Sequence, residues 1–363
     1  MRLQGKRILL ISPEPWQGLH MSKHHLSQAL AARGDQVFFL DPPDPGTRGI
    51  TTTPVDGVTV VRYHHWLRGI NRLPLWVNRR YYGGLVKRIA ARTGGPFDII
   101  WCFDTSRMQV FPDGLGLNLL HLADYDILHN GKALITSADI IFTTCQVVAD
   151  EVAPRSKART INIGHALDAR WTKGLESQQL RTNTTVRNVV FTGQLANSYN
   201  DWEGFLRIAS GHSEIQFSFI GPYDAAFPEP AFKALRELRN VTFTGLMTKD
   251  ELIPRARSAD LLLFGFRSAL RAKERANPHK VLEYLSTGNV IVGSYTMEYG
   301  TGQDMMCLAP EGGDLKETFD LALAHYADLN SAPERMKRIA FAKQRTMDRL
   351  IERIDRELDG MSA

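Results

Sequence analysis

Short apolar runs recur along the chain, and stretches with the spacing of amphipathic helices separate them. At the start, an Ile- and Leu-rich run at 6–12 is followed by helical spacing at 21–32 and a second apolar run at 37–40. This order of strand, helix and strand predicts a βαβ unit. The segment 41–57 is rich in Pro, Gly and Thr, so we expect a loop there. Further runs typical of buried parallel strands lie at 58–63, 98–102, 117–122 and 140–143.

A second alternating series begins at residue 187 and has the same character. Its expected strands lie at 187–193, 215–221, 241–245, 259–266 and 289–292, and its expected helices at 202–209, 230–238, 249–257 and 277–288. Such alternation predicts a parallel, doubly wound sheet. We therefore expect two α/β domains, at 1–170 and 187–335, joined by a polar linker at 171–186. The charged run 333–358 predicts one long helix within a C-terminal segment at 336–363.

The composition agrees with two globular domains. A chain of 363 residues is too long for one typical hydrophobic core, and 43% of its residues are hydrophobic. Cys102, Cys145 and Cys307 are far apart in or beside apolar runs, which favours reduced, buried thiols in a cytoplasmic protein. No run reaches the ~20 apolar residues that span a bilayer, and the first apolar run is too short for a signal peptide.

The stretch that starts at Asn277 combines a helix start, a helix end and a buried strand. Asn277 is a favourable N-cap, Pro278 suits the first helical position, and Gly288 supplies the left-handed residue that ends a helix. Lys280 and Glu283 share a face near the helix N-terminus, where free N–H groups and the helix dipole attract phosphate. A carboxylate at Glu283 can accept two hydrogen bonds from a ribose diol. The same spacing also fits an ordinary surface ion pair.

The sequence Asn-Pro-His-Lys-Val-Leu-Glu-Tyr-Leu-Ser-Thr-Gly-Asn-Val-Ile-Val resembles the nucleotide-binding signature of GT-B glycosyltransferases. It is similar in particular to bacterial family-4-like enzymes with the pattern Asn-Pro-x-Lys-x-x-Glu-Tyr-Leu. The fold of that family consists of two Rossmann-like, doubly wound parallel-sheet domains that face each other across a cleft. The resemblance implies that Glu283 binds the donor ribose. It also implies that Asn277, His279, Lys280 and Val281 lie beside the nucleotide and its phosphates.

Two departures from the family pattern are visible. Retaining members carry a Glu-x7-Glu pair, but Arg275 stands at the first position, with Glu274 beside it. The overall resemblance still favours a reaction that retains configuration, but the Glu-x7-Glu pair itself does not support it. The Arg and Lys that usually follow the first strand of the second domain are missing, and the segment begins with Gln194. Arg267 and Arg271, in the loop before the signature helix, are candidate substitutes, although they also fit a solvated loop.

Glycine follows several expected strands at their carboxyl ends, where open α/β sheets bind ligands. Gly193, Gly221 and Gly245 have such positions in the second series, and Gln194 follows the first of them. Gly18 lies in the loop after the first strand, which resembles the loop beside the donor sugar in the family. Each glycine alone also fits an ordinary turn. As a set, and together with the resemblance, they predict a nucleotide-sugar site.

Three side chains are candidates for chemistry at the acceptor. Asp124 and Asp104 each follow an expected strand, where a carboxylate can take the proton of an acceptor hydroxyl. His20 lies at the start of the first helix. Asp124 and Asp126 also form a D-x-D, which is a metal motif of the other large glycosyltransferase fold. The two-domain pattern argues against that fold, so we expect no metal and no cofactor.

Residues 62–92 contain eight Arg or Lys and no Asp or Glu, interleaved with Trp66, Trp76, Tyr81 and Tyr82. Basic residues with interfacial aromatics suit an anionic membrane surface. The same composition also suits nucleic acid or a solvated basic face. The resemblance favours the membrane, because similar bacterial enzymes often use lipid-linked acceptors. We expect a cytoplasmic protein, peripheral on the inner face of the plasma membrane, and no nucleic-acid partner.

Together these features predict a glycosyltransferase that uses a nucleoside-diphosphate sugar, UDP- or GDP-linked. Its expected acceptor is a glycan or lipid-linked glycan of bacterial polysaccharide or glycoconjugate synthesis. The second domain is expected to bind the nucleotide and the first the acceptor. A non-hydrolysing sugar-nucleotide epimerase shares the same fold plan and is an alternative. A non-catalytic module that binds a sugar nucleotide or a protein is another.

Overall fold

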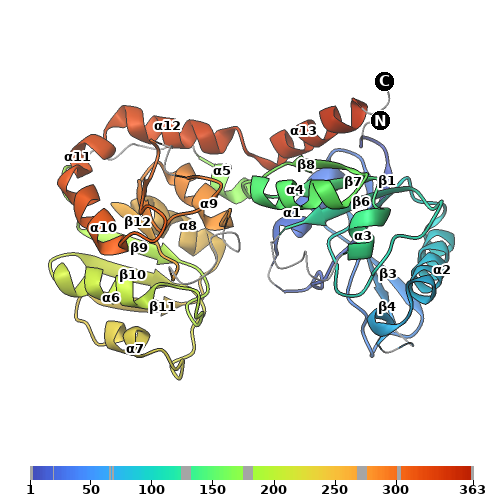
Figure 1. Ribbon diagram of the computed structural model, residues 1–363, viewed down its shortest axis with the longest axis horizontal. Coiled ribbons are helices and arrows are strands. Elements are labelled where there is room, and N and C mark those ends of the chain that lie inside the picture. Colours follow the sequence, from blue (N-terminus) through green and yellow to red (C-terminus); the bar gives the residue numbers. More distant parts are fainter. Residues whose placement is uncertain are drawn as a thin grey trace. The chain divides into compact units, whose positions relative to one another are not determined.

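The chain divides into two compact units. The computed structural model describes residues 3–18, 20–64, 67, 69–123, 132–174, 183–267, 276–300 and 304–360. The first unit comprises Met1–Ala166 and Met347–Ala363, and the second comprises Leu167–Thr346 (Figure 1). Half of the expected linker at 171–186 lies outside the described residues, and the division between the units falls before it, after Ala166. Among the described helices, none has the length and apolar character needed to cross a membrane.

The first unit is built on an eight-stranded sheet with the order β3-β4-β2-β1-β5-β6-β7-β8. Neighbouring strands are parallel except β3 and β4, which form an antiparallel pair. Most of the strands are buried apolar runs, as expected from the sequence. The strands are β1 Arg7–Ile11, β2 Gln36–Leu40, β3 Ile50–Val55, β4 Val58–Tyr63, β5 Ile99–Cys102, β6 Leu117–Leu122, β7 Ile140–Thr143 and β8 Arg159–Asn162.

The expected loop at 41–57 is wrong in its second half, where β3 forms an edge strand. The side chains of Thr51, Thr52 and Thr53 are exposed, so the segment lacks the apolar run that marks a buried strand. The hairpin to β4 turns at Asp56 and Gly57, which have φ of 51° and 80°. These two left-handed residues match a tight hairpin turn, and Asp-Gly is a favoured pair for it.

Helices cover the sheet of the first unit. They are α1 Ser22–Ala32, α2 Leu75–Thr93, α3 Lys132–Ser137, α4 Gln146–Val152 and α13 Met347–Asp359. Two short 3-10 helices, η1 Ile70–Arg72 and η3 Ala153–Arg155, precede α2 and follow α4.

The last helix completes the core of the first unit although it comes from the end of the chain. In α13, Leu350, Ile351, Ile354 and Leu358 lie in the same hydrophobic cluster as β1 and α1 (Figure 1). Asp355 of α13 accepts a hydrogen bond from the Leu3 N–H (2.8 Å) and pairs with Arg33 (2.6 Å). The chain therefore leaves the first unit after Ala166 and returns to it at Met347.

The expected single long helix at 333–358 is also wrong, because two helices occupy this stretch. α12 Ala332–Lys343 belongs to the second unit and α13 to the first. Between them, Arg345 leaves the helical pattern, and its carbonyl accepts a hydrogen bond from the Leu167 N–H (2.7 Å). The sequence did not reveal the break between α12 and α13 because helical spacing of apolar residues continues on both sides of it.

The second unit has a six-stranded, all-parallel sheet with the order β11-β10-β9-β12-β13-β14. Its strands are β9 Asn188–Thr192, β10 Gln216–Ile220, β11 Val241–Gly245, β12 Leu261–Phe264, β13 Val290–Gly293 and β14 Cys307–Leu308. Its helices are α5 Ala169–Thr172, α6 Trp202–Gly211, α7 Pro230–Arg236, α8 Lys249–Ser258, α9 His279–Thr287, α10 Leu315–Ala324, α11 Tyr326–Leu329 and α12.

Two hydrophobic clusters pack on the two faces of this sheet, so it is doubly wound. Val189 and Phe191 of β9 lie in the cluster with α6, α7 and α10, whereas Val190 between them lies in the cluster with α8, α9 and α12. Successive side chains of a strand point to opposite faces, which explains this division. Gly193 after β9, Gly221 after β10 and Gly245 at the end of β11 lie at one edge of this sheet, joined by backbone hydrogen bonds.

Candidate functional site

The signature helix α9 begins one residue later than expected. Pro278 holds the N-cap position with φ −68° and ψ 122°, and the helix starts at His279. This ψ is that of extended proline, so Asn277 and Pro278 precede the helix instead of capping and opening it. Gly288 ends the helix with φ 73°, as the sequence predicted. The first backbone N–H groups of α9 lack acceptors within the helix, which makes this end suited to an anion.

Three glycines bring the backbone of neighbouring strand ends into contact beside α9. The Gly193 N–H donates to Ile220 O, and the Gly221 N–H donates to Gly245 O (both 2.9 Å). A Cβ on Gly221 would lie 1.8 Å from the Gly193 oxygen, so no larger residue fits there without a backbone shift. Gly193 has φ 145°, which L side chains rarely adopt. Gly193, Gly221 and Gly245, which the sequence placed at strand ends, therefore form a closely packed edge of backbone that we call the glycine rim.

Lys280 reaches across to this rim. Its ammonium lies 4.2 Å from the centre of the Phe191 ring, and a Cβ on Gly193 would be 2.7 Å from Nζ. Burial lowers the pKa of Lys280 to about 8, and the nearby Glu283 opposes this shift. The lysine therefore carries a positive charge at neutral pH on a half-buried side chain. A bound phosphate would supply a counter-charge to it.

Glu283 lies one turn into α9 and is 7% exposed. Its Oε1 accepts a hydrogen bond from Lys249 Nζ (2.6 Å), and His279 Nδ1 lies 4.0 Å from the same oxygen. Lys249 in turn lies over the Trp171 ring, 5.5 Å from its centre. The surface ion pair that the sequence allowed between Lys280 and Glu283 is replaced by a partner from α8. Within the part of the chain that is described, no hydrogen bond to Oε2 is found.

The remaining candidates of the second unit differ in their surroundings. Val281 is fully buried and forms part of the core under α9. Gln194 is exposed, and its carbonyl accepts a hydrogen bond from Asn200 Nδ2 (2.9 Å). Arg267 pairs with Glu229, so its charge is already neutralised in part. Arg271 lies outside the described residues, as does Arg275.

Tyr284 fixes the position of α9 against the sheet. Its hydroxyl accepts a hydrogen bond from the Thr192 N–H (2.8 Å), and it lies within 3.4 Å of Leu263 O. Below α9, the buried Arg338 donates to the Gly288 carbonyl (2.9 Å) and so satisfies the helix end. These contacts hold α9 at its middle and at its C-terminal end, and so limit the freedom of the helix that carries Lys280 and Glu283.

Two functional candidates of this unit were missed by the sequence analysis. Lys249 stands at the first position of α8, directly after Thr248, whose side chain and Glu251 form a capping box. That Thr-x-x-Glu pattern marks the helix start, so it could have placed Lys249 at the same edge as Gly245. Arg170 pairs with Asp168 (2.6 Å), which is the main cause of its raised pKa, and Glu283 adds a smaller contribution in the same direction.

In the first unit, the loop after β1 brings Trp16, His20 and His24 together. The two imidazoles are stacked with centroids 4.9 Å apart, and Trp16 meets His20 edge-on. The Met21 N–H donates to His24 Nδ1 (3.0 Å), so Nε2 carries the proton and donates to Pro15 O (3.1 Å). Burial lowers the pKa of His24 to about 4, so this ring is neutral at pH 7. Gly18 of the same loop is exposed, with φ 119°.

Asp104 follows β5 and is 1% exposed. Its Oδ1 accepts from the N–H (2.9 Å) and the hydroxyl (2.6 Å) of Ser106, and its Oδ2 pairs with Arg107. Arg107 also donates to Ser12 O (2.8 Å), which ties this loop to the end of β1. The carboxylate is fully engaged in holding the loop. Its rival Asp124 lies outside the described residues, together with Asp126.

Comparison with known proteins shows likeness in structure but not in sequence. No protein-family model and no curated protein matches the chain. A sucrose-phosphate synthase from Thermosynechococcus elongatus matches with a TM-score of 0.67 and 15% identity, over 98% of this chain and 99% of that one. The trehalose-6-phosphate protein of E. coli bound with UDP-2-fluoro glucose gives 0.69 and 11%, over 97% and 98%. Anabaena HepE in complex with UDP and glucose gives 0.61 and 13%, over 98% and 99%. The chain therefore has the two-unit α/β fold of these proteins over its whole length, the GT-B fold expected from the sequence.

Proposed function

We propose that the protein is a glycosyltransferase that uses a nucleoside-diphosphate sugar as donor. The observation that carries the proposal is the pair Lys280 and Glu283 on one held helix, beside a rim of closely packed glycine backbone. Structures of the same fold contain UDP with glucose or a UDP-sugar analogue, which supports a donor of this class. The expected use of UDP or GDP follows from this likeness and from the signature.

The proposed donor site divides the nucleotide between two groups of atoms. The diphosphate lies at the N-terminus of α9, where backbone N–H groups, the helix dipole and the Lys280 ammonium neutralise its charge. The ribose diol donates two hydrogen bonds to Glu283. Because Lys249 already donates to Oε1 of that carboxylate, the ribose binds at Oε2 or displaces the lysine. Stabilising the charge that develops on the departing phosphate would then be the main contribution to catalysis.

The acceptor is proposed to bind in the first unit. His20 and the candidates Asp104 and Asp124 fall in the sequence range of that unit. If the reaction retains configuration, the departing phosphate itself takes the proton of the acceptor hydroxyl. An inverting reaction needs a protein carboxylate, for which Asp124 is the better candidate because the oxygens of Asp104 are already engaged. A glycan or lipid-linked glycan remains the proposed acceptor.

The test is calorimetric titration with UDP, GDP and their glucose, mannose and N-acetylglucosamine derivatives. It is followed by incubation of the best ligand with candidate acceptors. We expect micromolar binding of one nucleotide diphosphate and transfer of its sugar that survives excess EDTA. Loss of transfer in EDTA with recovery on Mn²⁺ would show that a metal is needed. Turnover of the donor alone into an epimer, detected by NMR, would instead identify a sugar-nucleotide epimerase. Binding without any turnover would identify a non-catalytic module.

A further inference from the structure

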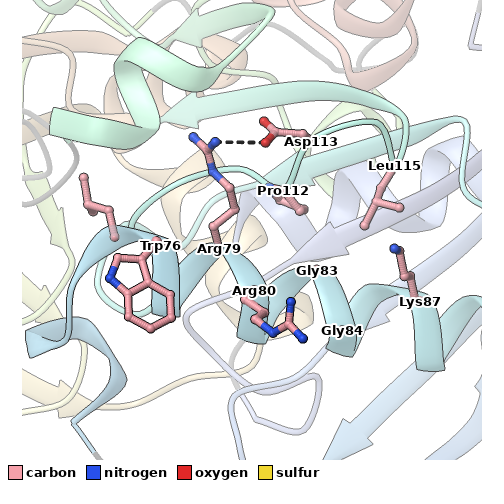
Figure 2. A pocket seen from close by; sticks show the side chains of 10 residues that line it. Trp76, Arg79, Arg80, Gly83, Gly84, Lys87, Pro112, Asp113 and Leu115 are labelled. Atoms are coloured by element: carbon pink, nitrogen blue, oxygen red, sulfur yellow. Dashed lines mark hydrogen bonds and ion pairs between the residues drawn. The ribbon is translucent and has the colours of Figure 1, made fainter.

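The outer side of α2 carries a groove that the proposed donor chemistry does not use. We call it the α2 groove. It lies between α2 and the loop at 112–115, has a volume of about 840 Å³, and is lined by Leu75, Trp76, Arg79, Arg80, Gly83 and Lys87 among others. Figure 2 shows these side chains along the helix, with Pro112, Asp113 and Leu115 on the facing loop. A second hollow of about 450 Å³ shares Lys87 and Leu115 with it, so the groove continues along the helix.

Two glycines leave the floor of the α2 groove without side chains. Gly83 and Gly84 lie in the middle of α2, where each glycine destabilises a helix relative to alanine. A Cβ on Gly83 would only touch Pro112 at 3.5 Å, and one on Gly84 would meet nothing within 4 Å. Packing therefore does not demand glycine at position 84. The missing side chain instead leaves open space in the groove.

The rim of the groove is strongly cationic. From residue 57 to 97 the chain has no Asp or Glu, and Arg79, Arg80 and Lys87 line the groove. Arg79 pairs with Asp113 across the groove (2.9 Å), as Figure 2 shows. Among the described residues, no carboxylate pairs with Arg80 or Lys87. An anionic ligand is therefore complementary to this surface.

The N-terminal end of α2 is apolar and projects into solvent. Leu73, Leu75 and Trp76 are 37%, 50% and 69% exposed. They are three of the nine large hydrophobic side chains that are exposed among the described residues, and they lie within four positions of each other. Aliphatic side chains and an indole beside cations have the composition of a segment that lies in the interface of a membrane.

We propose that the α2 groove docks the first unit on an anionic lipid bilayer. Leu73, Leu75 and Trp76 enter the interfacial layer, Arg80 and Lys87 bind lipid phosphates, and the bare floor at Gly84 receives part of a lipid. Leu73 and Leu75 match acyl chains, whereas a nucleic acid offers no apolar layer for them; Trp76 fits either partner. The proposal uses only residues of the first unit and does not depend on the transferase activity.

The test is co-sedimentation with vesicles of phosphatidylcholine alone or mixed with phosphatidylglycerol. We expect the wild type to bind the anionic vesicles and to be released as salt rises. Reversing two charges in Arg80→Glu/Lys87→Glu should weaken binding by about thirtyfold or more, because each near-surface cation contributes to it. The control Arg239→Glu/Arg255→Glu changes the net charge equally at exposed sites of the second unit and should bind like the wild type.

A second variant tests the open space of the groove without changing its charge. Gly84→Gln fills the open space with a polar residue that favours a helix, so Tm should not fall, while lipid binding should weaken severalfold. Equal binding to both vesicle types, or unchanged binding of Arg80→Glu/Lys87→Glu or of Gly84→Gln, would overturn the proposal. Retention of the wild type on RNA without retention on vesicles would also overturn it.

Discussion

Glu283 and Asp104 are two buried carboxylates, one in each unit, and they differ in how many donors they already hold. Asp104 receives two hydrogen bonds from Ser106 and a charged partner in Arg107, and all of these come from its own loop. Glu283 receives one short bond, from Lys249, at Oε1. A carboxylate has about four acceptor positions. The oxygens of Asp104 are therefore engaged within its own loop, whereas Oε2 of Glu283 has no hydrogen bond from the described residues.

The largest effect is expected at Asp104. Asp104→Ala should lower the free energy of unfolding by about 3 kcal/mol, because it leaves the Arg107 charge and the Ser106 donors without their acceptor. Nucleotide affinity should be unchanged, since the carboxylate lies in the other unit. Urea unfolding and calorimetry with UDP measure the two quantities. Ser106→Ala is the matched control and should lose only about 1 kcal/mol. If Asp104→Ala were as stable as the wild type but inactive in transfer, a catalytic role for Asp104 would be restored.

At Glu283 we expect a loss of nucleotide affinity with little loss of stability. Glu283→Ala should weaken the binding of the free nucleotide diphosphate by roughly 1.5–3 kcal/mol, the range for hydrogen bonds to a charged group. Stability should change little, because the ion-pair partners of the carboxylate, Lys249 and the more distant His279, are both partly exposed. Glu283→Gln keeps the shape of the side chain and one hydrogen-bond acceptor. Its nucleotide affinity should therefore lie between those of the wild type and Glu283→Ala. Wild-type affinity in the alanine variant would remove the ribose role.

The charge of Lys280 can be tested through the pH dependence of nucleotide affinity. Since burial lowers its pKa to about 8, the free protein loses this charge above that pH. Nucleotide diphosphate affinity should then fall by up to about tenfold per pH unit. The unfolded lysine titrates higher, so the same group makes the nucleotide-free protein more stable as pH rises through 8. Titrations at pH 7 to 9.5 measure the slope. The slope should vanish in Lys280→Met, and its persistence there would assign the effect to another group.

The smallest effect is expected at Lys249. Lys249→Met removes the ammonium, which lies 5.5 Å from the centre of the Trp171 ring, and so frees Oε1 of Glu283. If the ribose competes with this lysine, nucleotide affinity should rise by about 0.5–1 kcal/mol, the usual scale of a partly exposed ion pair. Calorimetry against the wild type at low salt is the measurement. A clear loss of affinity would mean that Lys249 itself contacts the nucleotide.

The local sequence alone predicted α9, its glycine end and the strand after it almost to the residue. The apolar run at 290–292, Gly288 and the polar face with Lys280 and Glu283 all act within a few positions of each other. The start was displaced by one residue because proline is compatible with both the first helical position and an extended conformation. β3 was missed because its threonines are exposed at a sheet edge and carry no apolar run.

The sequence by itself determined the two alternating α/β series, the glycines at the strand ends and the acid-free basic segment, because each depends on neighbours along the chain. Only the tertiary structure decided that α13 belongs to the first unit, since Ile351 and Ile354 share a hydrophobic cluster with residues of β1 and α1, more than three hundred positions away. It also decided that Glu283 meets Lys249 instead of Lys280, and that Asp104 is saturated. These outcomes depend on which strand ends come together in space, and helical or strand spacing carries no information about that.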